Sequence, residues 1–333
     1  MSETRIPQQQ EAILITAPGG PEVLRLGAVP VPVPGPEEVL IKIAAAGVNR
    51  HDCNQRRAGP DCEPNPVPGL EVAGAIVAVG NGVPEARLGE QVAALTQGGG
   101  YAHYVVAASA VALPAPRSLI PVEAAALPEA LFTAWFNFFD VLRLQPGERV
   151  LIHGGASGVA SLAIPALTAM NYDVFATCGS DSKRAAALGF GARAAFDYKD
   201  AGLAAQVKAA TNGRGVDVIL DLSAGAHVAA DLEMLAPDGR IGHLSAGGGT
   251  DLSIPLRTLM AKRISITGSL LRPLDTQRKT AVAERLLRDV WPLIGAAVRP
   301  AIAATFSLAE ASEAHRAMER GEHIGKIVLT VEG

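Results

Sequence analysis

Cysteine, long apolar runs and dense clusters of basic residues are all scarce in this sequence. Its three cysteines, Cys53, Cys62 and Cys178, are too few and too scattered for a disulfide framework or a four-thiolate zinc lobe. They favour a reducing, cytoplasmic setting. No segment reaches the roughly 18 apolar residues of a membrane span, and the N-terminal MSETRIPQQQEAILITAPGG lacks the apolar run of a secretory signal. With a net charge of -4 and no lysine and arginine stripe, the chain is not expected to bind nucleic acid.

The chain instead shows two different rhythms along its 333 residues, which are enough for two domains. Residues 10–120 contain short strands punctuated by glycine and proline, a pattern typical of a small barrel or sandwich. From about Pro121 onward, six continuous apolar strands alternate with helices, as in parallel βαβ units. We therefore expect an α/β protein with a doubly wound, six-stranded parallel sheet and a second, β-rich domain. The tail from about residue 270 is expected to return to the β-rich domain.

A turn of small residues follows the first strand of the expected sheet. In VLIHGGASGVA the dinucleotide-binding pattern G-x-G-x-x-G becomes G-x-S-x-x-A. Small side chains let backbone N–H groups and a helix N-terminus approach a pyrophosphate. The simpler interpretation is a tight turn with no ligand. Ser157 replaces the middle glycine, and its hydroxyl could donate to a phosphate or to a substrate.

The helix after this turn contains Pro165, which removes a backbone hydrogen bond and crowds the preceding turn. We predict a kink there. Because the phosphate-facing turn lies upstream of the proline, cofactor binding should survive.

The end of the second strand indicates which cofactor is used. NAD enzymes place an acidic residue there to hold the ribose diol, whereas DVFATC is followed by Gly179, Ser180 and Lys183. Hydroxyl and ammonium groups attract a 2′-phosphate, so NADPH is favoured. Asp181 is interpreted as the N-cap of the next helix. Tyr198 can either add a hydroxyl and a stacking face or be a half-buried strand tyrosine.

Several ordered motifs then carry a family resemblance: GVNRHDCNQR, PVPGLEVAGAIVAVG, ALPEALFTAWFNFF, RVLIHGGASGV, GSDSKRAAALGFGA, GSLLRP and HIGKIVLTV. Together they resemble the zinc-independent quinone oxidoreductases of the medium-chain dehydrogenase/reductase superfamily, and in particular the branch of the tumour-suppressor-inducible quinone reductase. The resemblance implies a GroES-like catalytic domain at residues 1–123 and 269–333 around a Rossmann domain at 124–268. It also implies a homodimer that pairs Rossmann sheets edge to edge, and NADPH in the interdomain cleft.

The resemblance also implies that no catalytic zinc is held. Zinc alcohol dehydrogenases of the superfamily carry ligands where this chain has Asn49, Leu70 and Glu129. Leucine cannot ligate a metal and asparagine is a poor zinc ligand. Quinones and activated enones, which need no Lewis acid, are then the expected acceptors. One departure from the branch is the segment after Arg57, Ala58-Gly59-Pro60-Asp61-Cys62, which lacks the aromatic residue that relatives often carry.

The same resemblance assigns cofactor positions residue by residue. Those near the nicotinamide are Asn49 and Thr133. Those at the pyrophosphate are Gly155, Ala156, Ser157, Gly158 and Val159. Those at the adenosine phosphate are Gly179, Ser180, Lys183 and Tyr198, and those after the fourth and fifth strands are Ser223, Leu244 and Ser245. Three more residues line the cleft: Leu270, Leu271 and Lys326. For the leucines, plain core packing is the alternative.

Reduction of a quinone also needs a proton, which solvent can supply. His51 occupies the place of a relay hydroxyl in zinc alcohol dehydrogenases, and imidazole donates readily near neutral pH. We therefore expect Asn49, His51, Thr133 and Ser157 to be the catalytic group, and a structural histidine is the alternative for His51. Arg50 is interpreted as a pyrophosphate partner, Asp52 as a local cap and Cys53 as packing.

The predicted function is that of an NADPH-dependent, metal-free quinone reductase. The first alternative is an enoyl reductase acting on α,β-unsaturated carbonyls. The second is a non-catalytic, crystallin-like NADPH-binding protein.

Overall fold

The computed structural model describes residues 6–223, 227–245, 249 and 251–331. The chain divides into two compact units. The first, the β-rich unit, comprises Met1–Glu129, Asp275–Gly295 and Arg299–Gly333, and the second, the parallel-sheet unit, comprises Ala130–Leu274 and Ala296–Val298. The expected domain boundaries at residues 123/124 and 268/269 stay a prediction. Among the described residues, no helix has the length and apolar character needed to cross a membrane.

The parallel-sheet unit has the strand order β10-β9-β8-β11-β12-β13 within the described part of the chain. Its strands are β8 (Arg149–His153), β9 (Asp173–Cys178), β10 (Ala194–Asp197), β11 (Val216–Asp221), β12 (Leu235–His243) and β13 (Ser265–Gly268). All five neighbouring pairs are parallel. Every residue of the central strand β11 is buried, as expected for a strand covered on both faces. The order 3-2-1-4-5-6 is that of a doubly wound dinucleotide fold, so the predicted fold class is confirmed.

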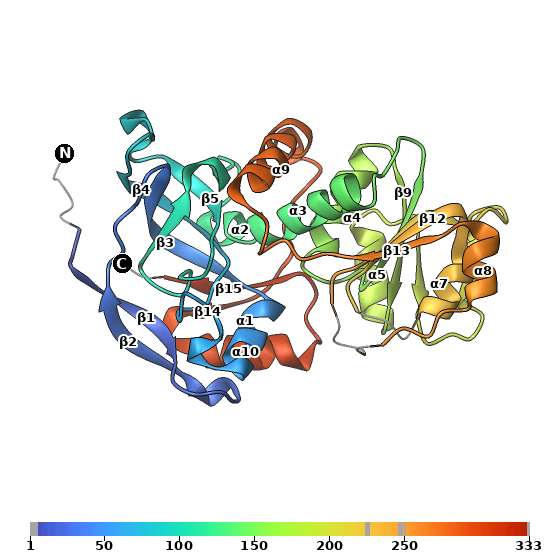
Figure 1. Cartoon of the computed structure of the whole chain (residues 1–333), viewed down its shortest axis with the longest axis horizontal. Coiled ribbons are helices and arrows are strands. Elements are labelled where there is room, and N and C mark those ends of the chain that lie inside the picture. Colours follow the sequence, from blue (N-terminus) through green and yellow to red (C-terminus); the bar gives the residue numbers. More distant parts are fainter. Residues whose placement is uncertain (1–5, 224–226, 246–248, 250, 332–333) are drawn as a thin grey trace. The chain divides into compact units, whose positions relative to one another are not determined.

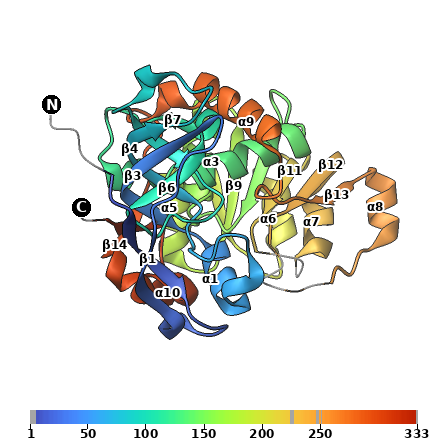
Figure 2. The same cartoon turned by 60° about the vertical axis from the view of Figure 1, so that its left-hand side comes forward.

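Helices connect and cover these strands. They are α4 (Ala160–Ala169), α5 (Asp181–Gly189), α6 (Leu203–Ala210), α7 (Val228–Met234) and α8 (Leu256–Lys262). Figure 2 shows α6 and α7 side by side, and their apolar residues, among them Val207 and Leu232, pack on Phe175 and Ile219 of the sheet. The chain enters this unit within α3 (Pro128–Trp135), which continues as a π-helical segment over Phe136–Val141.

The β-rich unit is built on a second sheet of order β14-β15-β3-β4-β5-β7, with β6 also paired to β3. Its strands are β3 (Glu38–Val48), β4 (Glu71–Val79), β5 (Gln91–Leu95), β6 (Tyr104–Ala108), β7 (Ala112–Pro114), β14 (Ile302–Ser307) and β15 (Lys326–Thr330). A hairpin of β1 (Gln9–Ile15) and β2 (Leu24–Pro30) accompanies it (Figure 1). The C-terminal strand β15 pairs antiparallel with β3, so the tail does return to this unit.

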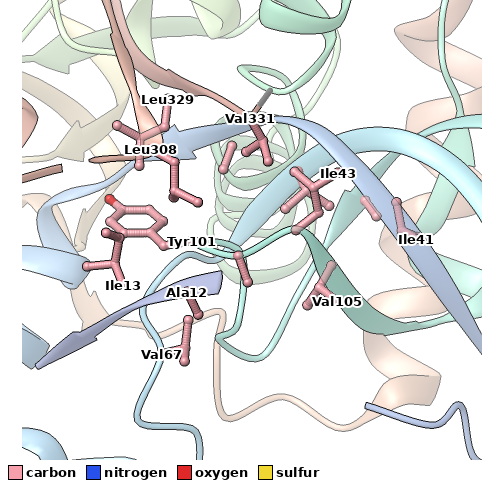
Figure 3. Packing of buried hydrophobic residues seen from close by; sticks show 14 of the residues in the cluster. Ala12, Ile13, Ile41, Ile43, Val67, Tyr101, Val105, Leu308, Leu329 and Val331 are labelled. Carbon is pink, nitrogen blue, oxygen red and sulfur yellow. The ribbon is translucent and has the colours of Figure 1, made fainter. Parts of the chain in front are cut away.

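Helices of the β-rich unit are α1 (Arg50–Ala58), α2 (Pro121–Ala124), α9 (Thr276–Asp289) and α10 (Ala311–Arg320). One large apolar cluster joins the hairpin, the sheet and α10. In Figure 3 the ring of Tyr101 lies in this cluster among Ile13, Leu308 and Leu329. The core therefore fixes α1 and α10 against the sheet edge where β3 ends.

Candidate active-site residues

The carboxyl ends of the parallel strands meet at one edge of their sheet. His153 of β8 lies opposite both Thr177 of β9 and Asp221 of β11, and Asp221 lies opposite His243 of β12. The segments that follow these strands therefore start side by side along what we call the carboxyl edge. Fifteen of the predicted site residues belong to the parallel-sheet unit, and all but Thr133, which lies on α3, follow the carboxyl ends of its strands. They are Thr133, Gly155, Ala156, Ser157, Gly158, Val159, Gly179, Ser180, Lys183, Tyr198, Ser223, Leu244, Ser245, Leu270 and Leu271. Ligands of doubly wound sheets bind at this kind of edge.

The small-residue turn after β8 is tightly packed at its start. A Cβ on Gly155 would meet the Cβ of Ala176 at 2.5 Å, and Gly154 has φ +75°. Glycine is therefore required in this turn. Ser157 Oγ accepts a hydrogen bond from the backbone N–H of Ala160 at 3.2 Å, and its own hydroxyl hydrogen can still donate to a phosphate. These features fit a backbone cradle for a pyrophosphate.

Helix α4 runs through Pro165 without interruption, from Ala160 to Ala169. The proline is half-buried within the helix. Whether the axis bends at Pro165 stays a prediction, but the phosphate-facing turn does lie before it.

The adenosine end of the predicted site is formed around Gly179. A Cβ there would come within 2.8 Å of the ring of Tyr198, which is 38% exposed. Ser180 is the N-cap of α5, and its Oγ accepts from the Lys183 backbone N–H at 3.4 Å. The prediction that Asp181 caps this helix is therefore wrong. Asp181 is the first helical residue and pairs with Arg184 instead, because Ser180 has the extended backbone of a cap.

Other predicted positions have local partners of their own. Ser223 donates from its backbone N–H and its hydroxyl to Asp221 Oδ1 at 2.8 and 3.0 Å. The carbonyl of Thr133 accepts from Asn137 Nδ2 at 2.8 Å. Leu271 is buried, as core packing requires, whereas Leu270 is 69% exposed. The Leu244 backbone N–H donates to the Asp221 carbonyl at 2.9 Å.

A buried histidine, His153, holds the strand ends at the carboxyl edge together. His153 contacts Asp231 Oδ1 through Nε2 at 2.8 Å and Thr177 Oγ1 through Nδ1 at 2.7 Å. Burial alone lowers the pKa of His153, but the charge and hydrogen bond of Asp231 outweigh it, so the pKa is raised. These two contacts tie the end of β8 to β9 and to α7, immediately before the turn that follows β8.

Three predicted positions lie in the β-rich unit, and two of them meet a buried carboxylate. Asn49 Nδ2 donates to Glu71 Oε1 at 2.9 Å, Lys326 Nζ donates to Asn49 Oδ1 at 2.8 Å, and Lys326 also pairs directly with Glu71. The backbone N–H of Glu129 donates to Glu71 Oε2 at 2.9 Å. We call Asn49, Glu71, Glu129 and Lys326 the Glu71 cluster. Because lysine only donates, the orientation of the Asn49 amide is fixed.

The Glu71 cluster also contains an acid with a perturbed pKa. Burial and the nearby charge of Glu71 raise the pKa of Glu129 to about 8, although Lys326 opposes them. Glu129 therefore holds a proton near neutral pH.

The donor set at these positions does not suit a three-ligand zinc site. Both ends of the Asn49 amide are engaged within the Glu71 cluster, and the neighbouring Leu70 is buried and has no lone pair. Across the described residues, histidine, cysteine and acidic side chains form no group of three suited to a metal ion.

The third predicted position, His51, lies in the first turn of α1. Its Nε2 is 3.5 Å from Glu63 Oε1, and the side chain is 34% exposed. Arg50 donates to the carbonyl of Met318 at 2.9 Å, and its assignment to the pyrophosphate stays a prediction. Asp52 accepts from the Asn49 backbone N–H at 2.8 Å, so its predicted capping role is confirmed. Cys53 is fully buried, and burial raises the pKa of its thiol to about 12, as its packing role requires.

Sequence reasoning missed Glu71, Lys199 and His227. Glu71 opens an otherwise apolar strand, and a carboxylate in such a place signals a buried cationic partner. Lys199 Nζ lies 5.6 Å from the centroid of the Tyr198 ring and donates to the Gly179 carbonyl at 3.3 Å. His227 contacts the Tyr198 ring with centroids 5.3 Å apart. Nothing in the local sequence around His227 distinguishes it.

Much of the chain matches models of known protein families. Residues 35–117 match the family model of the alcohol dehydrogenase GroES-like domain, and residues 158–287 match that of the zinc-binding dehydrogenase. A quinone oxidoreductase of Rattus norvegicus is 32% identical, covering 96% of this chain and 97% of the relative. A mycocerosic acid synthase-like polyketide synthase of Mycobacterium tuberculosis is 31% identical over 99% of this chain, which spans only 16% of the synthase.

Among solved structures, a quinone oxidoreductase of Thermus thermophilus, also solved in complex with NADPH, has a TM-score of 0.81 and 32% identity. The alignment covers 96% of this chain and 99% of that one. Such identity over nearly the full length of both chains settles family membership and, with it, dependence on a nicotinamide cofactor. The chain belongs to the medium-chain dehydrogenase/reductase superfamily, as an oxidoreductase with quinone oxidoreductases among its relatives.

Proposed function

We propose that this chain is an NADPH-dependent quinone reductase that works without a metal. The observation that carries the proposal is the Glu71 cluster, in which Asn49 is held by Glu71 and Lys326 where zinc relatives have a ligand. An acceptor that needs no Lewis acid suits such a site. Quinones are acceptors of this kind, and quinone oxidoreductases are similar over nearly the whole chain.

The residues of the carboxyl edge would hold the cofactor, which supplies a hydride when bound. The backbone N–H groups of Gly158 and Val159 face the pyrophosphate in this proposal, with the Ser157 hydroxyl as a further donor. The N–H groups of Gly155 and Ser157 already donate to the carbonyls of Thr177 and Gly154. In the β-rich unit, Asn49 and Lys326 orient the nicotinamide end, and His51 holds a proton for the reduced acceptor. Thr133 is assigned to the nicotinamide by its place in the family motif.

The preference for NADPH rests on the adenosine end. Ser180 and Lys183 stand where an NAD enzyme carries an acidic residue, and Lys199 adds a second ammonium group beside Tyr198. Lys183→Ala should therefore raise the KM for NADPH and leave the KM for NADH unchanged. Lys208→Ala, on α6 and away from the carboxyl edge, is the matched control. Equal catalytic efficiency of the wild-type chain with the two cofactors would contradict the preference.

The reaction is tested by NADPH oxidation with a panel of ortho-quinones, para-quinones and enones. We expect the quinones of this panel to be reduced with a higher kcat/KM than the enones. Turnover of enones alone would instead support the enoyl reductase, an alternative favoured by the similarity to a segment of a polyketide synthase. Tight NADPH binding with no turnover of any acceptor would support a non-catalytic binding protein.

We also propose a homodimer that pairs the parallel sheets through β13. This strand is the outermost on its side of the described sheet, and none of its residues is fully buried. The neighbouring α8 exposes Leu256 and Met260. Light scattering should give twice the mass of the chain, and Thr267→Pro in β13 should give a monomer. The domain boundaries and the cytoplasmic setting stay predictions.

A further inference from the structure

A network of buried polar side chains, which we call the Tyr101 network, crosses the β-rich unit and ends beside the predicted site residue Asn49. Tyr101 Oη contacts Asp52 Oδ2 at 3.0 Å and His315 Nε2 at 3.2 Å. His315 Nδ1 in turn contacts Arg56 Nη1 at 3.3 Å. The four side chains are each at most 1% exposed, although they come from α1, from the segment before β6 and from α10. The ring of Tyr101 is held in place by the apolar cluster (Figure 3).

While Asp52 is ionised, the donors and acceptors of the Tyr101 network allow only one arrangement of protons. Arginine can only donate, so His315 Nδ1 must accept from Arg56. His315 is then the neutral Nε2–H tautomer, and this N–H donates to the Tyr101 oxygen. The Tyr101 hydroxyl is left to donate to Asp52. Burial and the charge of Arg56 lower the pKa of His315 to about 3, which agrees with a neutral ring.

Asp52, at the end of the Tyr101 network, holds two segments that carry residues of the Glu71 cluster. Its Oδ2 also accepts from the Asn49 backbone N–H at 2.8 Å, and its Oδ1 accepts from the Gly69 backbone N–H at 3.2 Å. Gly69 stands two residues before Glu71. One carboxylate thus fixes the start of α1 and the start of β4 with respect to each other.

We propose that Asp52 is a positioning residue for the reductase, aligned by Tyr101, His315 and Arg56, and that it sets the geometry of Asn49 and Glu71. The inference rests on the proposed function, because it assigns Asn49 and Glu71 to the reaction. Asp52 acts through backbone N–H groups and does not touch the substrate.

Other charged groups around Asp52 affect its titration. The charge of Glu71, on β4, raises the pKa of Asp52. Arg50 and Arg56 of α1, and Glu319 of α10, lie close enough to act on the neighbouring Cys53. Glu129 is close enough to be perturbed by Asp52 as well. Burial raises the pKa of Asp52 to about 6, while the hydrogen bonds from Asn49, Tyr101 and Gly69 oppose the rise. Loss of the Tyr101 hydroxyl therefore raises the pKa of Asp52 further.

The kinetic test compares two variants, Tyr101→Phe and Tyr104→Phe. Tyr104→Phe also removes the hydroxyl of a buried tyrosine, but it leaves the Tyr101 network intact. Tyr101→Phe should lower kcat by about tenfold to 100-fold, since small displacements at a reacting centre cost that much. Its KM for NADPH should not change, and the acid limb of its pH profile should move to higher pH. Identical kcat values and pH profiles for the two variants would overturn the positioning role.

A spectroscopic arm stays informative if the wild-type chain reduces no quinone and the proposed function fails. Nitrogen-15 spectra should show His315 as the neutral Nε2–H tautomer at every pH at which the chain is folded. The amide protons of Asn49 and Gly69 should move upfield in Asp52→Asn, because each loses a carboxylate acceptor. A His315 that is cationic or carries its proton on Nδ1, or amide protons that do not move, would contradict the proposed hydrogen bonds of the Tyr101 network. If Asp52→Asn does not fold, the Nε2–H proton of His315 is measured in Tyr101→Phe, where it should shift because its acceptor oxygen is gone.

Discussion

Lys326 neutralises the carboxylate of Glu71 by pairing with it directly. Glu71 is fully buried, and Lys326 is 3% exposed. Lys326→Met should therefore lower the free energy of unfolding by about 3 kcal/mol, since it leaves a buried charge uncompensated. The double variant Lys326→Met, Glu71→Gln should lose less than the sum of the two single losses. Urea unfolding with an unchanged m-value measures each loss.

The exposed pair Arg316 and Glu313 on α10 serves as the control for this cycle. Its removal should cost less than about 1 kcal/mol, because water screens the charges. Additive losses at Lys326 and Glu71 would mean that the two side chains do not interact as described.

His51 is the predicted proton donor, and its contact with Glu63 defines the matching control. His51→Ala should lower kcat by about 100-fold if the imidazole donates the proton in the rate-limiting step. The effect should depend on pH, because solvent takes over the transfer as the medium becomes more acidic. Glu63→Gln keeps the imidazole and should retain most of the activity. Wild-type turnover of His51→Ala between about pH 5 and 9 would show that solvent supplies the proton.

Among the elements, the turn between β8 and α4 gives the most direct test of the cofactor cradle. Gly155→Ala places a Cβ 2.5 Å from that of Ala176 on β9, so one of the two segments must shift. NADPH affinity and melting temperature should both fall. Ala176→Gly in the same chain removes the obstructing methyl group and should restore most of the NADPH affinity. Calorimetric titration with NADPH measures both variants, and normal binding by Gly155→Ala alone would argue against a tightly packed cradle.

The parallel-sheet unit could be predicted from the sequence because its signals are local. Each strand is a continuous apolar run, and the strand order follows from the βαβ rhythm. The position of the turn after β8 follows from the same rhythm. The assignment of the N-cap to Asp181 failed because Ser180 and Asp181 are both good caps, and only the backbone conformation separates them.

The Glu71 cluster could not be predicted in the same way, because it depends on pairing between distant strands. Glu71 opens β4, Lys326 opens β15, and both strands flank β3, whose end leads to Asn49. These three residues are far apart in the sequence, and no periodic pattern connects them. The resemblance to a family located Asn49 and Lys326, but it did not reveal that Glu71 binds both of them.

At the scale of the whole molecule, buried titratable groups should give stability a maximum in acidic solution. Glu129 and Asp52 have raised pKa values in the folded chain, about 8 and about 6. Their contributions are complete below the ordinary carboxyl pKa and are lost as pH rises through these values. His315 has a lowered pKa of about 3, so its contribution is complete above the ordinary histidine pKa and is lost as pH falls. The melting temperature should therefore be highest at about pH 4, because above that value the falling contributions of Glu129 and Asp52 together outweigh the rising contribution of His315.

Glu129→Gln tests the alkaline side of this maximum, because glutamine mimics the protonated carboxyl at every pH. The variant should lose less stability than the wild-type chain between about pH 6 and 9, where each pKa unit is worth up to about 1.4 kcal/mol. Part of the decline should remain, because the raised pKa of His153 acts in the same direction. Glu284→Gln, at an exposed position on α9, should follow the wild-type curve. Parallel alkaline curves for Glu129→Gln and the wild-type chain would show that Glu129 is ionised throughout, and that the Glu71 cluster carries two negative charges rather than one.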